Sequence, residues 1–115
     1  MIRWRMALVQ MNALVGDLVG NARRVERGIR RARDAGCDFV VFPELAVTGY
    51  PPEDLLLKPA FLQANVDAVR SLVAATEGIT AIVGFVDVGE DVYNAAAILH
   101  NGEWAGTYHK HYLPN

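Results

Sequence analysis

The chain has 115 residues, of which 52% are hydrophobic and 21% are charged, so it suits one small globular domain and not a disordered segment. Its formal net charge of −2 offers no basic surface to a nucleic acid and no polybasic anchor to a membrane. The single cysteine, Cys37, excludes an internal disulfide and a cysteine-based zinc site. The apolar stretch 6–9 is too short for a signal sequence or a membrane span, and we therefore predict a cytoplasmic protein.

The first half of the chain has the pattern of a parallel β-α-β unit. Residues 4–11 are predicted as a short buried strand, followed by an N-cap at Asp17 and an amphipathic helix that Gly36 ends. The apolar positions of this helix recur at steps of three and four residues: Leu18, Ala22, Val25, Ile29 and Ala32. Residues 38–42 are mostly β-branched and aromatic, which indicates a strand buried on both faces. This order of elements predicts parallel pairing of the two strands.

The second half predicts another helix, another buried strand and a hairpin. Pro59 suits the first turn of a helix that ends before Gly78. Its predicted inner face consists of Leu62, Val66, Val69, Val73 and Thr76. Residues 79–86 follow as a strand, and Asn101-Gly102 predicts a type I′ turn between strands 93–100 and 103–110. We therefore expect an α/β fold with two helices and about five strands.

Arginine outnumbers lysine nine to two, and six of the nine arginines fall between residues 23 and 33. Such a cluster could form an anion-binding face or the solvated side of one helix. The apolar positions interleave with the arginines at helical spacing, which favours the solvated side.

Glu44 is the strongest catalytic candidate because it follows the predicted buried strand 38–42. Open α/β sheets place ligands beyond the carboxyl ends of their strands. Pro43 has no N–H, so it ends ladder pairing and turns the chain outward. A carboxylate here can act as a general base, but the same position also suits a surface glutamate in an ordinary loop.

Lys110 stands at the end of a predicted hairpin strand, where a lysine can stabilise an oxyanion or extend its charge into solvent. His109 and His111 flank it, and strand alternation predicts both on the opposite face. Two histidines without a third ligand do not make a metal site. Gly16 and Gly20 do not have the spacing of nucleotide-binding loops, so we expect no cofactor site and no metal site in this chain.

Cys37 is a nucleophile by chemistry, but its predicted position argues against that role. It opens the strand whose far end leads into Glu44, and the intervening residues at roughly 3.3 Å each separate the two by about 20 Å. A nucleophile and its base must approach within about 3 Å. We therefore interpret Cys37 as a small packed apolar residue.

The order and spacing of these motifs resemble the nitrilase, or carbon–nitrogen hydrolase, superfamily over essentially the whole chain. The matching residues, in chain order, are Ala7-Leu8-Val9-Gln10, Gly16-Asp17, Asn21, Phe42-Pro43-Glu44-Leu45, Thr48-Gly49-Tyr50, Tyr93-Asn94-Ala95-Ala96, Tyr108, Lys110 and Leu113. Two segments are similar more narrowly to the glutaminase domain of the glutamine-dependent NAD⁺ synthetases. They are residues 48–57 and Leu113-Pro114-Asn115.

The resemblance implies an α-β-β-α sandwich with a Glu-Lys-Cys triad that hydrolyses the amide of glutamine. Glu44 would be the general base, and Lys110 would stabilise the oxyanion. The family's nucleophilic cysteine lies some tens of residues beyond the lysine. We therefore expect residues 1–115 to be the N-terminal portion of a glutaminase domain, inactive alone, with the downstream half and the synthetase domain absent. ATP and Mg²⁺ would belong to that synthetase domain.

Two alternatives stay open at the level of sequence. One is a free-standing nitrilase-family amidase, against which the stretch 51–57 argues; the other is a truncated, non-catalytic interaction module. Half a sandwich would leave apolar helix and sheet faces uncovered, which favours self-association, so we expect a homo-oligomer. The sequence does not decide whether Glu44 and Lys110 lie close in space.

Overall fold

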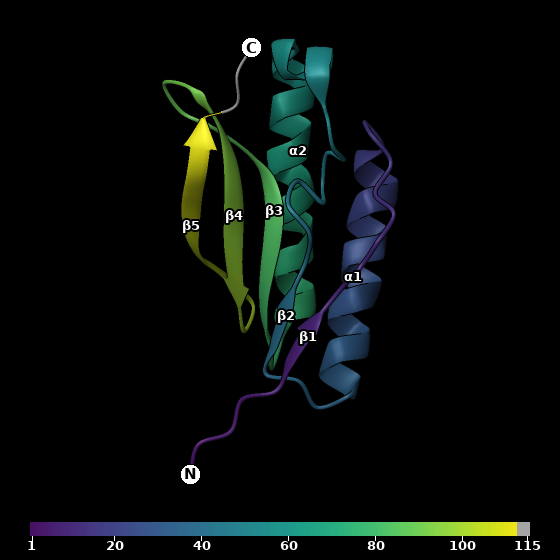
Figure 1. Ribbon diagram of the computed structural model, residues 1–115, viewed down its shortest axis with the longest axis vertical. Helices are drawn as coiled ribbons and strands as arrows, with labels where there is room; N and C mark the ends of the chain where they lie inside the picture. The colour runs from purple at the N-terminus through teal and green to yellow at the C-terminus, as the bar shows by residue number, and fades with distance from the viewer. Residues whose placement is uncertain (113–115) are drawn as a thin grey trace.

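The computed structural model describes residues 1–112, with side chains through residue 110 (Figure 1). The Leu113-Pro114-Asn115 motif and the side chain of His111 therefore lie outside the described residues. One five-stranded sheet has the order β1-β2-β3-β4-β5, formed by β1 (Met6–Leu8), β2 (Phe39–Val41), β3 (Thr80–Val88), β4 (Val92–His100) and β5 (Glu103–Tyr112). The helices are α1 (Leu18–Asp34) and α2 (Pro59–Leu72), with 3₁₀ turns at Glu53–Leu57 and Val73–Thr76. The predicted α/β class is confirmed.

The predicted β-α-β unit is present, because β1, β2 and β3 pair in parallel. At the start of α1, the side chain of Asp17 accepts a hydrogen bond from the N–H of Gly20 at 3.0 Å, as an N-cap should. Strand β1 is shorter than the predicted 4–11. At Arg5 the backbone carbonyl still accepts from the N–H of Phe39 at 3.2 Å, while the N–H of Arg5 donates to the carboxylate of Asp38 at 2.8 Å.

The second half also follows the sequence pattern. Pro59 occupies the first turn of α2, and the predicted inner face is divided between α2 and the 3₁₀ turn after it. Asn101 and Gly102 have φ values of 49° and 84°, which confirms the left-handed turn of the β4–β5 hairpin. Within the described part of the chain, no helix has the length and apolarity needed to cross a bilayer.

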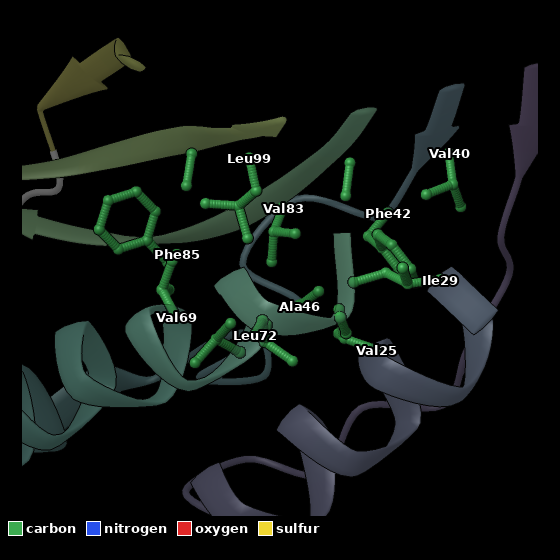
Figure 2. Close-up of a cluster of buried hydrophobic side chains, with 14 of the residues drawn as sticks. Val25, Ile29, Val40, Phe42, Ala46, Val69, Leu72, Val83, Phe85 and Leu99 are labelled. Atoms are coloured by element: carbon green, nitrogen blue, oxygen red, sulfur yellow. The ribbon is translucent and has the colours of Figure 1, made fainter. Parts of the chain in front are cut away.

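One face of the sheet, the closed face, packs against both helices. Paired residues point to the same side of a sheet, and the row Ala7, Val40, Ala81 and Leu99 crosses from β1 to β4 on this face. It meets the buried residues of the helices, which include Val25, Ile29, Val69 and Leu72 (Figure 2). Phe85 is fully buried there and contacts Trp104 edge to face, with ring centroids 5.5 Å apart. The closed face is therefore the hydrophobic core.

The opposite face, the open face, is apolar but uncovered by any described residue over much of its area. The adjacent row on this side is Leu8, Val41, Ile82 and Ile98. Its edges are solvent-exposed, with Leu8 75% and Tyr108 63% exposed. Soluble monomers rarely expose a contiguous apolar surface of this kind. The expectation that an apolar sheet face is left uncovered is therefore met.

Candidate active site

Glu44 and Lys110, the two catalytic candidates from the sequence, lie side by side. Glu44 follows β2. Just before it, the N–H of Phe42 donates to the carbonyl of Ile82 on β3 at 3.0 Å. Lys110 reaches Glu44 from near the end of β5, with its Nζ 3.5 Å from Oε2. Both side chains are partly open to solvent, at 46% exposed for Glu44 and 42% for Lys110. The topology therefore assembles a carboxylate and an ammonium at one edge of the sheet.

Gly84 allows the segment of Glu44 to lie directly against β3. A Cβ atom at Gly84 would stand 2.5 Å from the carbonyl oxygen of Pro43 and 2.5 Å from the nitrogen of Leu45. Such distances are far inside van der Waals contact, so every residue except glycine would push the segment away. Gly84 follows Val83 and precedes Phe85, both on the closed face, so Glu44 is attached on the open face.

The loop that carries Glu44 is held by buried groups. Leu45 is fully buried at a left-handed φ of 52°, a conformation that a non-glycine residue adopts only where its surroundings enforce it. The N–H of Val47 donates to the carbonyl of Gly84 at 3.2 Å. The buried amide of Asn21 donates to the carbonyl of Val47 at 2.9 Å and to that of Leu14 at 2.8 Å. These contacts fix the backbone on which Glu44 stands.

Lys110 stands on a β-bulge that the sequence did not predict. Ala95 of β4 pairs with His109, but the next residue, Asn94, pairs with His111, so Lys110 is an extra residue in β5. A bulge bends its strand and redirects the inserted side chain, and bulges concentrate beside active sites. Simple alternation of side chains along β5 is therefore interrupted at the residue that contacts Glu44.

Cys37 lies away from this pair, as predicted. It precedes β2, whereas Glu44 follows β2, so the length of the strand separates them. Its half-buried side chain packs against the closed-face core. Among the described residues, no group of three or more histidine, cysteine, aspartate or glutamate side chains is placed to hold a metal ion.

Three of the six arginines of α1 contact the helix itself or its neighbours. Arg24 lies 3.6 Å from the N-cap carboxylate of Asp17, and Arg30 lies 3.4 Å from Glu26 one turn earlier. Arg33 donates to the carbonyl of Ala75 at 3.1 Å. These contacts agree with the interpretation of the cluster as the solvated side of one helix.

Three features of the site were missed at the level of sequence: the close approach at Gly84, the bulge at Lys110, and the side chain of Asn94. Asn94 is 1% exposed, and its amide nitrogen and oxygen have no hydrogen-bond partner among the described residues. An isolated glycine within a strand pattern was a usable signal for Gly84. The bulge had no local signal, because it depends on the register between two strands.

Comparison with known proteins decides the family. A family profile described as carbon-nitrogen hydrolase matches residues 5–115. The chain belongs to the carbon–nitrogen hydrolase family. This carbon–nitrogen hydrolase chain is 44% identical to the glutamine-dependent NAD(+) synthetase of Thermotoga maritima, with 100% of the chain and 20% of the relative covered. It is 48% identical to the Xylella fastidiosa synthetase, with 96% of the chain and 21% of the relative covered. The carbon–nitrogen hydrolase chain thus spans about one fifth of these relatives.

Solved structures agree with this family assignment. Glutamine-dependent NAD+ synthetase from Acinetobacter baumannii superposes with a TM-score of 0.87 at 33% identity, covering 97% of this chain and 22% of that one. An amidase from Nesterenkonia sp. superposes with a TM-score of 0.80 at 22% identity, covering 99% of this chain and 46% of the amidase. The amidase establishes likeness of fold only. The fold is that of the nitrilase superfamily, as the sequence predicted.

Proposed function

We propose that this chain is the N-terminal part of the glutaminase domain of a glutamine-dependent NAD⁺ synthetase. In this proposal it supplies Glu44 and Lys110 to a Glu-Lys-Cys triad. The observation that carries the proposal is the 3.5 Å approach of Lys110 to Glu44 at the carboxyl ends of the parallel strands. The synthetase relatives, 44% and 48% identical over nearly the whole chain, support glutamine as the substrate.

The nucleophile in this proposal comes from protein outside the present chain. The sequence holds one cysteine, Cys37, and it lies at the wrong end of β2. The open face is apolar and carries the segment of Glu44. A second layer that covers this face would bring its thiol to the carboxylate and would remove water from the pair. Excluding water strengthens the field that Lys110 exerts on the reacting atoms.

In the acylation step, Glu44 takes the proton of the thiol while sulfur attacks the side-chain amide carbon of glutamine. The carbonyl oxygen becomes an oxyanion, which the Lys110 ammonium stabilises. The C–N bond then breaks, the nitrogen receives the proton held by Glu44, and ammonia leaves. A thioester remains on the cysteine.

In the second step, Glu44 takes a proton from water, and the resulting hydroxide attacks the thioester carbon. Lys110 again stabilises the oxyanion, the C–S bond breaks, and the thiolate recovers the proton from Glu44. Glutamate is released. The ammonia would pass to deamido-NAD⁺ on a synthetase domain, and ATP with Mg²⁺ would supply the activation there.

The test uses the complete protein that contains this chain, with ammonia release from glutamine as the readout. Glu44→Gln removes the base and is expected to lower kcat by about 10²- to 10⁴-fold. Lys110→Met removes the charge at the oxyanion and is expected to cost about 10²- to 10³-fold. The matched control is Lys58→Met, which changes the only other lysine, an exposed residue before α2, and should leave the rate unchanged.

Full ammonia release by the Glu44→Gln protein would contradict the assigned roles. If the parental protein releases no ammonia from glutamine but hydrolyses simple amides, the substrate assignment is wrong and the free-standing amidase is the better account.

A further inference from the structure

His109, next to Lys110 in sequence, is part of a side-chain cluster that ties three strands together at the bulge. Its Nε2 lies 2.6 Å from Oδ2 of Asp87 on β3. Because a carboxylate only accepts, the Nε2–H of His109 is the donor. The His109 ring also stacks on Tyr93 of β4, with centroids 4.1 Å apart and planes 8° from parallel. One imidazole on β5 thus contacts its neighbour β4 and also β3, the strand beyond it.

This cluster lies on the side of the sheet opposite to Glu44. Asp87 alternates with Phe85, which points into the closed-face core, and Asp87 pairs directly with Tyr93. The segment of Glu44 lies against Gly84 on the open face. His109 therefore anchors β5 from one face, and Lys110 reaches Glu44 from the other. The placement of His109 agrees with the prediction that His109 and His111 lie opposite Lys110, and the side chain of His111 lies outside the described residues.

A bulge needs such an anchor if it is to aim a side chain accurately. The inserted residue has no cross-strand partner, so the ladder is disrupted where Lys110 stands. The residue before Lys110 is His109. Its hydrogen bond to Asp87 and its stack on Tyr93 fix its position against β3 and β4. Lys110 has a long flexible stem, and the start of that stem is set by the backbone of the bulge.

We propose that His109 is a positioning residue for Lys110: held by Asp87 and Tyr93, it fixes the bulge from which the Lys110 ammonium meets the site of Glu44. This inference rests on the proposed function. His109 does not touch the reacting atoms and exchanges no proton with them. It acts through the backbone that it shares with Lys110.

The expected effects on reaction rate and on the free energy of unfolding distinguish this positioning role from simple stabilisation. The Asp87–His109 pair is 29% and 42% exposed, and partly exposed pairs contribute little to the free energy of unfolding. Placement of a charge at an oxyanion is far more sensitive, since a misplacement of about 1 Å can cost about 10²-fold in rate. Loss of His109 should therefore reduce turnover much more than it reduces stability.

The experiment measures ammonia release from glutamine by the complete protein in three substitutions of His109. His109→Ala removes the bond and the stack. His109→Gln retains an N–H near the position of Nε2, whereas His109→Asn places its N–H nearer the position of Nδ1 and does not reach Asp87. We expect kcat to fall about 10-fold or more for Ala and Asn, and within about 3-fold of the parent for Gln. KM for glutamine should not change, because the interaction acts in the transition state.

Two further variants complete the design. Asp87→Ala removes the hydrogen bond but leaves the stack on Tyr93, so kcat should fall in this variant, though no further than in His109→Ala. The double variant should be no worse than His109→Ala, because that substitution already removes the contact with Asp87. The matched control is His100→Ala, which removes another cross-strand bond to β3, the 2.7 Å contact with Thr80 at the far end of the hairpin. That variant should keep the parental kcat.

The outcomes distinguish this inference from the proposed function. A parental protein that releases no ammonia from glutamine overturns the proposed function itself. If the parent is active and His109→Ala keeps its kcat, the positioning role alone is wrong. Equal losses in the Ala, Asn and Gln variants, with matching losses in thermal stability, would also overturn it, since the geometry of the Nε2 bond would then be irrelevant.

Discussion

The two faces of the sheet differ in how much of each is covered by other described residues of this chain. On the closed face, α1 and α2 cover the row through Val40, Ala81 and Leu99, and these three side chains are fully buried. On the open face, Leu8 remains 75% exposed although its neighbours in the row are also apolar. Both faces are hydrophobic, but only one has a partner among the described residues. Apolar composition alone therefore does not tell a core from an uncovered surface.

The chemistry of the proposed function would lie on the open face. The segment of Glu44 lies against β3 on that face, and Lys110 reaches Glu44 there. The closed face holds the hydrophobic core, and on that side His109 contacts Asp87 and Tyr93. Because the open face is uncovered by described residues, a protein layer that packs on it can supply the thiol that the proposed site lacks. The separation of the core on one face from the Glu44–Lys110 pair on the other agrees with a chain that has no thiol beside this pair.

The largest expected effect on stability comes from a comparison of two alanine substitutions, each of one aromatic residue on one face of the sheet. Phe85→Ala empties a fully buried position of the closed face and should lower the free energy of unfolding by about 3–5 kcal/mol. Tyr108→Ala changes an open-face residue that is 63% exposed and should cost less than about 1 kcal/mol. Urea unfolding of both variants measures the difference. Equal losses would mean that the open face is packed in solution.

A smaller effect on stability is expected at Gly84, where the segment of Glu44 contacts β3. Gly84→Ala places a methyl group against the backbone of Pro43 and Leu45 and should cost about 1–3 kcal/mol. It should also move Glu44 away from Lys110. The control, Gly106→Ala, adds its methyl group at an open position of β5, where the nearest atom is 3.9 Å away. Thermal unfolding of the two variants gives the comparison, and a neutral Gly84→Ala would show that the loop can shift freely.

The smallest stability effect is expected for a polar substitution on the open face. Leu8→Ser should change the free energy of unfolding by no more than about 0.5 kcal/mol, because the side chain is already largely exposed. It should reduce self-association of the isolated chain, since it interrupts the uncovered apolar surface. Sedimentation velocity across a concentration series measures this. An isolated parental chain that is monomeric at every concentration would contradict the expectation of a homo-oligomer.

Much of this fold could be predicted from the sequence, because its determinants are local. Asp17 marks the start of α1, Pro59 that of α2, and Asn101-Gly102 the hairpin turn; each acts within a few residues of itself. The position of Glu44 was predictable as well, because a proline after a buried strand directs the next side chain beyond the sheet. The strand limits were less accurate: β1 spans Met6–Leu8 and not 4–11, because the extent of a strand depends on pairing with residues distant in sequence.

The rest of the site depends on register, which no local pattern specifies. The bulge at Lys110 exists only in the pairing of β5 with β4, and the contact of His109 with Asp87 follows from that pairing. The side that alternation predicts for His109 agrees with the structure although the bulge interrupts alternation at Lys110, and alternation could not identify Asp87 and Tyr93 as the partners. The buried amide of Asn94 was also unforeseen, because burial of a strand residue depends on packing with residues distant in sequence.

The most direct test compares ammonia release from glutamine by the isolated 115-residue chain and by the complete protein that contains it, side by side. Our account predicts turnover by the complete protein and none by the isolated chain, because Glu44 and Lys110 have no thiol within reach there. Turnover by the isolated chain that Glu44→Gln abolishes would contradict it, since the pair would then be a finished site and not half of one.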